Sequence, residues 1–305
     1  SVTIPDSVTE MGECVFKDCC NLQKFKGKFA TTDGNAIITN DVFIAYSPYC
    51  SLTEYVIPNN VIRIATCAFR ENEYLEKVVI PNSVVEIGEG VFSSSGNIKQ
   101  FEGKFVIDNG RAIVVDNLFV AYANGCEIAE YTIPDGVTKI GWYAFDNSIH
   151  LEKVTIPETV TEVGDVSFAF CYSLQSVYCK PTTPPIAILD NFAGYGWEAF
   201  DWNFGTTIYV PAASVEEYKS ADGWSKYADN IVGYDFEKGE VVQSNNEIWY
   251  TATEKVLPYK TDNFGANIVS NEWNESTGKG IITFDGEVTS IGEYAFGYCT
   301  SLTSV

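Results

Sequence analysis

A pattern of apolar and polar positions recurs through about the first 180 residues and has the form IPxxVxxIGxxxFxxxxxLxxVxI. A leucine or isoleucine opens the last apolar segment of each copy, at Leu22, Leu52, Leu75, Ile98, Ile128, Leu151 and Leu174. Successive positions are 30, 23, 23, 30, 23 and 23 residues apart. Repeats of this length predict a solenoid, because one unit cannot bury its apolar side alone and must stack on its neighbours.

Each copy predicts a short strand, a turn and a second apolar segment. In LxxVxI, residues such as Leu75, Val78 and Ile80 point to one side, as in a strand with a slight offset from strict alternation. Proline follows and stops the strand, because it lacks the amide donor that a continuing ladder needs. A phenylalanine further on predicts one core residue per coil, at Phe16, Phe69, Phe92, Phe145, Phe168 and Phe296.

The two longer coils predict hairpin insertions. The second copy follows the first by 76 residues, so that Tyr46 corresponds to Tyr122 and Cys50 to Cys126. Turn residues at 32–35 and 108–110 lie beside β-rich runs, which is a strong hairpin signal. Duplication of the whole block of three coils explains this correspondence.

The pattern stops after Val177, and a proline-rich run at 180–185 prevents another coil. An aromatic stretch at 192–204 and a strand-like TIYVP at 207–211 follow. Ser214 and Glu217 have the spacing of a capping box and predict a helix with an apolar face formed by Trp224, Tyr227 and Ile231. A solenoid end exposes unpaired strand groups. We therefore expect residues 1–180 to form the array and residues 181–236 to form a module that caps it.

The last part of the chain predicts the start of a second array. From residue 237 the composition becomes polar, which is typical of a linker. Apolar runs at 248–252 and 280–284 predict strands that lead into a new copy of the repeat at 288–305. We expect residues 237–305 to contain a linker, an opening cap and the first coil of a second, truncated array.

Stacked coils place charged residues in columns on the exposed strand face. The column two positions after the strand-opening residue brings Lys24, Glu54 and Lys77 together, and also Glu130 and Lys153. Coils about 4.8 Å apart make these pairs neighbours, each contributing about 0.2 to 1 kcal/mol. An ion-pair ladder between coils is therefore favoured over a site for a charged ligand. The neighbouring column adds Glu76 beside Lys99. The candidate binding surface contains charged residues of both columns and two tryptophans of the aromatic stretch: Lys24, Glu54, Lys77, Lys99, Glu130, Lys153, Trp197 and Trp202.

Composition removes several classes of function. The net charge of −22 would repel nucleic acid and anionic membrane surfaces. No run of 18 or more apolar residues is present, so the sequence predicts no membrane-spanning segment. The chain contains a single histidine, His150, in a slot that other coils fill with variable residues, so an exposed loop position is expected. Hydrolase, metalloprotease, phosphate-cradling and calcium-loop motifs are absent from the sequence, and we predict a protein that is not an enzyme and binds no cofactor or metal.

The nine cysteines fall in repeated slots of the coils. Three follow the core phenylalanine by three residues, where other coils carry asparagine or serine, and these are Cys19, Cys171 and Cys299. Cys14 and Cys67 share a second slot, and Cys50 and Cys126 a third. This pattern favours buried thiols, one per coil, over disulfides or a metal site. The adjacent Cys19 and Cys20 and the isolated Cys179 are the candidates for reactive thiols.

The motif IPxxVTxIGxxAFxxCxxLxxV, laid out at 133–154 and 284–305, resembles the bacterial BspA-like leucine-rich repeat family. The resemblance covers nearly the whole chain. It implies a leucine-rich-repeat-like right-handed solenoid, rich in β structure, with short helical turns, a parallel strand face, two hairpin insertions and a capping module with a short helix. It also implies a secreted or surface-anchored bacterial protein, and some members of the family are adhesins for matrix or plasma proteins. The matching residues are core positions, so no functional residue is carried over.

Three functions fit these observations. A non-catalytic, protein-binding surface module of the adhesin type is favoured, because a solenoid offers a broad binding face. A glycan-binding module would use exposed aromatic residues of 192–204, and burial of Trp197 and Trp202 would count against it. A structural spacer that holds another domain away from the cell is the third.

Overall fold

The computed structural model describes residues 1–188, 199–201, 203, 205–243 and 245–305. These residues form two compact units, Ser1–Val232 and Gly233–Val305. The first unit contains the repeated coils together with the segment expected to cap them.

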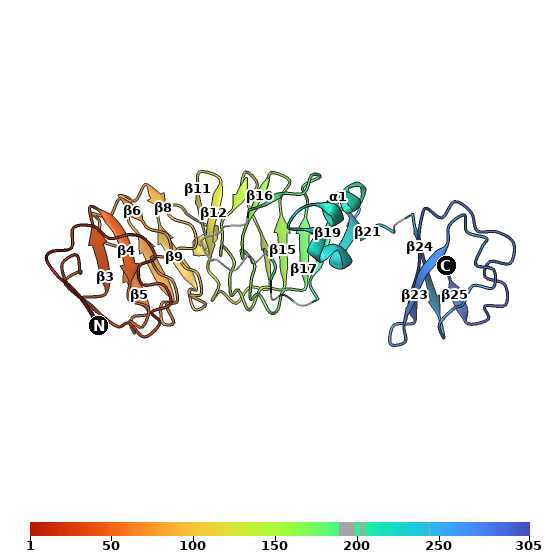
Figure 1. Cartoon of the computed structure of the whole chain (residues 1–305), viewed down its shortest axis with the longest axis horizontal. Helices are drawn as coiled ribbons and strands as arrows, with labels where there is room; N and C mark the ends of the chain where they lie inside the picture. Colours follow the sequence, from red (N-terminus) through yellow and green to blue (C-terminus); the bar gives the residue numbers. More distant parts are fainter. Residues whose placement is uncertain (189–198, 202, 204, 244) are drawn as a thin grey trace. The chain divides into compact units, whose positions relative to one another are not determined.

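The first unit is the predicted solenoid, in which the closing strands of neighbouring coils pair in parallel within three separate sheets (Figure 1). A short sheet contains β1 (Val2–Ile4) and β2 (Phe25–Gly27). A second contains β5 (Glu54–Val56), β7 (Lys77–Ile80) and β9 (Gln100–Gly103). The third has the order β13 (Glu130–Thr132), β15 (Lys153–Ile156), β17 (Ser176–Cys179), β19 (Thr207–Pro211), β20 (Ile231–Asp235) and β21 (Glu240–Val241).

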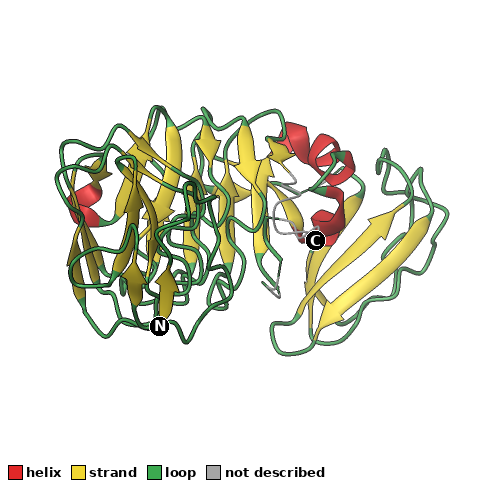
Figure 2. Ribbon diagram, turned by 60° about the vertical axis from the view of Figure 1, so that its left-hand side comes forward, coloured by secondary structure: helices red, strands yellow, loops and turns green. Residues whose placement is uncertain are grey.

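A second row of strands combines the short strands that follow the proline turns with the strands of the two hairpins. Its first sheet has the order β3 (Ala36–Thr39), β4 (Val42–Tyr46), β6 (Arg63–Ile64) and β8 (Glu86–Ile87). Its second has the order β10 (Val106–Ile107), β11 (Ala112–Val115), β12 (Leu118–Tyr122), β14 (Lys139–Ile140), β16 (Glu162–Gly164) and β18 (Ile186–Ile188). Figure 2 shows the strands of successive coils running side by side along the unit.

The two predicted hairpins are present, and each contains a turn that the sequence analysis did not identify. The expected turn at 108–110 is a 3₁₀ turn, η1 (Asp108–Gly110), between antiparallel β10 and β11. The tighter turns are Asn40-Asp41, between β3 and β4, and Asp116-Asn117, between β11 and β12. All four residues have positive φ, which is the backbone of a two-residue type I′ turn.

The core of the first unit is a column of aromatic rings. Phe69, Phe145 and Phe168 are fully buried and Phe92 is 5% exposed, as the repeat predicts, whereas Phe16 in the first coil is half-buried. Ring centroids of Phe69 and Phe92 lie 5.2 Å apart, and those of Phe145 and Phe168 lie 4.8 Å apart. Each ring therefore covers the ring of the next coil.

The capping segment contains the predicted helix, but the expected capping box was wrong. The 3₁₀ turn η2 (Ala212–Ser214) leads into α1 (Val215–Ser220), next to β19 (Figure 1). Ser214 makes no side-chain cap, because its hydroxyl donates to the carbonyl of Thr182 instead. The predicted helical face does not continue, since η3 (Ser225–Asn230) is a 3₁₀ helix and Ile231 begins β20. Tyr218 and Trp224 are nevertheless buried in the core of the array.

The second unit is a small antiparallel sheet with the order β23 (Ile268–Asn274), β24 (Lys279–Phe284), β22 (Glu247–Ala252) and β25 (Leu302–Ser304). The strands predicted at 248–252 and 280–284 are β22 and β24. The linker expected from residue 237 was wrong in part, because β20 turns back into β21 with Tyr234 opposite Val241. Backbone amides of Glu237 and Lys238 donate to the Asp235 carboxylate and hold this turn.

Candidate functional site

The solvent-facing side chains of the closing strands form the candidate site, which we call the sheet face. Along β7, β15, β17 and β19 the residues alternate between half-buried and buried. Because successive side chains of a strand point to opposite sides, the buried set fills the core and the other set faces solvent. The sheet face contains Glu54, Lys77, Val79, Gln100 and Glu102 in the second sheet and Glu130, Lys153, Thr155, Ser176, Tyr178, Thr207 and Tyr209 in the third.

Ion pairs join neighbouring coils across the sheet face, as the charge columns predict. Lys77 Nζ lies 3.4 Å from Glu54 and 2.8 Å from Glu102, and Lys153 Nζ lies 3.2 Å from Glu130. The hydrogen bond to Glu102 raises the pKa of Lys77. In the neighbouring column, Lys99 lies 3.0 Å from Glu76. Each lysine is thus neutralised by a carboxylate beside it, so this column is a ladder between coils rather than a cationic patch.

Lys24 does not join this ladder, and its expected place beside Glu54 was wrong. Strand β2 pairs with β1, whereas Glu54 begins β5 in a separate sheet. The Nζ atom of Lys24 donates to the Asp33 carbonyl oxygen, 2.9 Å away, and to the Asn35 side chain. The hairpin inserted in this coil supplies these acceptors and separates the two closing strands.

Two tyrosines stack at the capped end of the sheet face, and we call this pair with its lysine the tyrosine stack: Lys153, Tyr178 and Tyr209. Tyr178 lies opposite Tyr209 in the paired strands, with ring centroids 4.7 Å apart and ring planes at 20°. The Lys153 ammonium lies over the Tyr178 ring, 5.0 Å from its centroid. Both rings are half-buried. The faces of Tyr178 are therefore occupied by Tyr209 and Lys153.

Sequence reasoning missed the tyrosine stack because it followed only the columns one and two positions after the strand-opening residue. The residue four positions after the strand-opening residue also faces solvent, and in successive coils it is Lys26, Val56, Val79, Glu102, Thr132, Thr155 and Tyr178. Tyr209 continues this column from the strand-like TIYVP, which lies outside the repeat. The sequence feature that could have predicted the tyrosine stack is the change to aromatic residues in the last two strands of this column.

The aromatic stretch at 192–204 is only partly described. Trp197 and Trp202, the two tryptophans of the candidate binding surface, lie outside the described residues. Phe200 is 3% exposed and stacks on Phe168, with ring centroids 5.0 Å apart and planes at 10°. Phe200 thus extends the aromatic column of the core toward Trp224, whose ring centroid is 5.9 Å away.

Other candidate chemistry is sparse in the part of the chain that the structure describes. His150 is exposed, as expected. Across the described ranges, no three residues of the types His, Cys, Asp and Glu are grouped so that they could hold a metal ion. None of the helices in these ranges has the length and apolar character that a bilayer crossing requires. All nine cysteines are free.

The slot after the core phenylalanine buries Cys171, as predicted, but Cys19 is exposed and Cys299 is half-buried, so the expectation of a buried thiol in each coil was wrong in part. The Cys171 sulfur lies 3.1 Å from the carbonyl oxygen of Phe145. In an earlier coil, the Ser95 hydroxyl donates to the corresponding carbonyl of Phe69 over 2.7 Å. A small, weakly polar side chain is therefore required at this slot to satisfy the carbonyl of the preceding coil, and cysteine and serine both do so.

The chain matches the sequence pattern of the BspA type leucine rich repeat region in six copies, over residues 36–105, 119–189 and 266–305. These matches span more than half of the chain. No curated protein is similar enough in sequence to count as a match.

Solved structures with a similar fold include three bacterial proteins. A leucine rich cell surface protein from Faecalibacterium prausnitzii is 27% identical, with 58% of this chain and 47% of that chain covered and a TM-score of 0.43. The pneumococcal vaccine antigen PcpA is 18% identical, with 76% and 53% covered and a TM-score of 0.43. A leucine-rich repeat protein from Eubacterium ventriosum is 18% identical, with 63% and 55% covered and a TM-score of 0.37. This chain spans about half the length of each.

Proposed function

The chain belongs to the BspA type leucine-rich repeat family, and from this premise we propose that it is a non-catalytic binding module that recognises a protein through the tyrosine stack. The location that fits this role is the bacterial cell surface or its surroundings, as the family resemblance implies. The observation that carries the proposal is the pair of stacked, half-buried tyrosines on an otherwise charge-neutralised face.

Rigid tyrosines are well suited to protein recognition. Tyrosine offers a large contact area with few rotatable bonds and a hydroxyl for hydrogen bonding, and it is enriched among the residues that dominate binding energy. Stacking on Tyr209 and contact with Lys153 restrict the rotamers of Tyr178 before a partner binds. The partner therefore loses little free energy to ordering this side chain.

A protein partner fits the tyrosine stack better than a glycan that packs on ring faces. Sugars commonly use their apolar faces against the open face of an aromatic ring. In Tyr178 one ring face meets Tyr209 and the Lys153 ammonium lies over the ring. Each tyrosine combines an apolar ring with a polar hydroxyl, and this combination suits the mixed polar and apolar surface of a protein.

Binding measurements with matched tyrosine variants test this proposal. The immobilised chain is exposed to a panel of purified extracellular-matrix and plasma proteins and, in parallel, to a glycan array. For a protein that binds saturably, Tyr178→Ala and Tyr209→Ala should each weaken binding about tenfold or more. Lys153→Ala should have a smaller effect because it leaves both rings in place.

Tyr172→Ala is the matched control, because Tyr172 is 66% exposed but lies on a turn outside the sheet face. Its binding should equal that of the unmodified chain. If Tyr172→Ala and Tyr178→Ala weakened binding equally, this would contradict the assignment of the tyrosine stack as the binding site. Saturable binding on the glycan array alone would contradict the class of partner, and silence on both surfaces would favour a spacer.

A further inference from the structure

A column of residues with left-handed backbone runs through the turns that precede the core phenylalanines. It contains Cys14, Cys67, Gly90, Tyr143 and Val166, with φ values between 48° and 60°. These are equivalent positions in successive coils, apart from the two hairpin coils, which lack this turn. The coil of Cys14 therefore contacts the coil of Cys67 directly, although the whole first hairpin lies between them in the sequence.

Hydrogen bonds across this junction fix the two cysteine slots against each other. Glu13 Oε2 accepts a hydrogen bond from the backbone amide of Thr66 over 2.9 Å, and Glu13 Oε1 accepts one from Arg63 over 2.6 Å. These bonds involve the residues next to Cys14 and Cys67. The Cys14 sulfur itself lies 3.4 Å from the carbonyl oxygen of Thr66.

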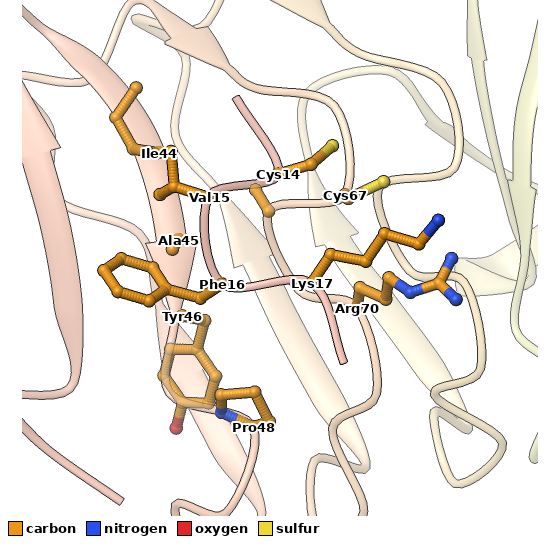
Figure 3. A pocket seen from close by; sticks show the side chains of 11 residues that line it. Cys14, Val15, Phe16, Lys17, Ile44, Ala45, Tyr46, Pro48, Cys67 and Arg70 are labelled. Atoms are coloured by element: carbon orange, nitrogen blue, oxygen red, sulfur yellow. The ribbon is translucent and has the colours of Figure 1, made fainter. Parts of the chain in front are cut away.

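Cys14 and Cys67 both line a small pocket, where their side chains lie next to each other (Figure 3). The neighbouring Cys14 side chain lowers the pKa of Cys67, and the positive charges of Arg70 and Lys17 lower it further against the opposing effect of burial. The neighbouring Cys67 side chain, together with burial, raises the pKa of Cys14. The pair thus consists of one thiol that favours its thiolate and one that stays protonated, which is the arrangement of a reactive dithiol.

The spacing of the coils suits a covalent bond between these sulfurs. Neither cysteine lies in a strand, but the Cys14 sulfur lies 3.4 Å from the backbone oxygen of Thr66, the residue next to Cys67. The Cα atoms of a disulfide lie roughly 4.4 to 6.8 Å apart, so adjacent coils can hold such a bond. Other cysteines of the unit have different neighbours. Cys171 contacts the Phe145 carbonyl, Cys179 contacts the Tyr218 hydroxyl, and Cys50 contacts the Asn35 side chain.

We propose that Cys14 and Cys67 form a reversible disulfide by exchange with a small-molecule disulfide. The Cys67 thiolate attacks one sulfur of the reagent, forming a mixed disulfide and releasing one thiolate. Cys14 then loses its proton to solvent and attacks the Cys67 sulfur, which releases the second half of the reagent as a thiolate. The two cysteines are oxidised by two electrons, and the reagent is reduced to two thiols.

The disulfide joins the two coils that flank the first hairpin. A cross-link between residues distant in sequence restricts the unfolded chain and so resists opening of the structure between them. Oxidation therefore strengthens the first part of the array without a change of fold. An extracellular setting, where disulfides persist, would favour this oxidised form.

Peptide mapping of the whole chain tests the proposal. The folded, reduced chain is incubated with oxidised glutathione, remaining thiols are alkylated, and the denatured chain is digested with trypsin. Cys14 falls in the peptide 1–17, Cys67 in 64–70, and Cys19 and Cys20 in 18–24. The expected product is peptide 1–17 joined to 64–70, with seven cysteines alkylated and a thermal midpoint several degrees above that of the reduced chain.

Two variants make the result specific. Cys14→Ser should lose both the joined peptides and the thermal shift, and should retain glutathione on Cys67. Cys126→Ser, at a half-buried cysteine of another slot, should still give the joined peptides. Nine alkylated cysteines after oxidation, or a disulfide confined to peptide 18–24, would overturn the proposal.

Discussion

The two hairpin blocks of the solenoid have equivalent aromatic cores, and they differ at the junctions where the coils that flank each hairpin meet. In the first block, ring centroids of Phe43 and Phe69 lie 4.8 Å apart with planes at 9°. In the second, the equivalent Phe119 and Phe145 lie 4.7 Å apart with planes at 10°. The tyrosine pairs agree as closely, with 4.7 Å and 58° for Tyr46 and Tyr55 and 4.8 Å and 58° for their counterparts Tyr122 and Tyr131.

The two junctions have one interaction in common and differ in the others. Glu13 bonds Arg63 and the amide of Thr66, and the equivalent Glu89 bonds Lys139 and the amide of Trp142. The dithiol slots, however, hold Gly90 and Tyr143 in the second block. The position of Arg70, which pairs with Asp18, holds Asp146, which accepts from the Ser94 amide over 2.7 Å. Packing thus constrains the duplicated core, while the two junctions carry different chemistry.

The largest expected effect comes from breaking the shared core. Phe69→Ala and Phe145→Ala should each lower the free energy of unfolding by about 3 to 5 kcal/mol, and by similar amounts, because both rings are fully buried in equivalent stacks. Denaturant unfolding followed by circular dichroism measures both. If either alanine variant does not fold, Phe69→Leu and Phe145→Leu give the same comparison with a smaller loss of stability. A large difference between the blocks would show that their cores are not equivalent.

A pH dependence should distinguish the second junction from the first. Burial raises the pKa of Asp146 from 3.8 to about 7, against the opposing effects of the Ser94 hydrogen bonds and Arg70. The folded chain therefore binds this proton more tightly than the unfolded chain. Its contribution to stability should fall as the pH rises from about 4 to 7, by up to roughly 1.4 kcal/mol per pH unit.

The matched variant for this pH effect is Asp146→Asn, which removes the titrating group. The difference in unfolding free energy between variant and unmodified chain should grow in favour of the variant from pH 4 to pH 7 and then stay constant. A difference that is independent of pH would show that Asp146 titrates normally.

The equivalent glutamates of the two junctions should contribute unequally to stability. Glu89→Gln should cost about 1 to 2 kcal/mol, because the Glu89 side chain is only 17% exposed and bonds both Lys139 and an amide. Glu13→Gln should cost less, since Glu13 is 33% exposed and Arg63 keeps a second partner in Glu86. Chemical denaturation of both variants checks the order, and the reverse order would contradict this account of burial.

The smallest expected effect is a gain of stability in both blocks. Asp41→Gly and Asn117→Gly replace residues with φ of 62° and 67° in the type I′ turns. Glycine adopts this backbone without strain, so each should gain about 0.5 to 1 kcal/mol. Thermal unfolding of the two variants measures the gain, and a loss in either would mean that its side chain stabilises the turn.

Regular parts of the fold could be predicted because the repeat length determines which residues become neighbours. A step of 23 residues places Glu54 beside Lys77 and stacks Phe145 on Phe168, and both pairs are present. The prediction for Lys24 failed because the hairpin interrupts the row of closing strands. The cap at Ser214 failed because a distant carbonyl, that of Thr182, competes for its hydroxyl.

The candidate sites depend on contacts that cross the boundaries of the repeat. Tyr209 lies outside the repeat, so its stacking on Tyr178 required knowledge of how the array ends. Cys14 and Cys67 could be assigned to one slot, but their contact depends on how the inserted hairpin leaves the array. Sequence periodicity therefore predicts the core and only part of the surface.

The most direct test of the shared architecture is to install the dithiol in the second junction. Gly90→Cys combined with Tyr143→Cys places cysteines in tryptic peptides 78–99 and 140–153, neither of which contains another cysteine. After oxidation with glutathione, the account predicts that these two peptides are joined, as 1–17 and 64–70 are in the same sample. Joining of the first pair without the second would contradict the claim that both blocks stack in one register.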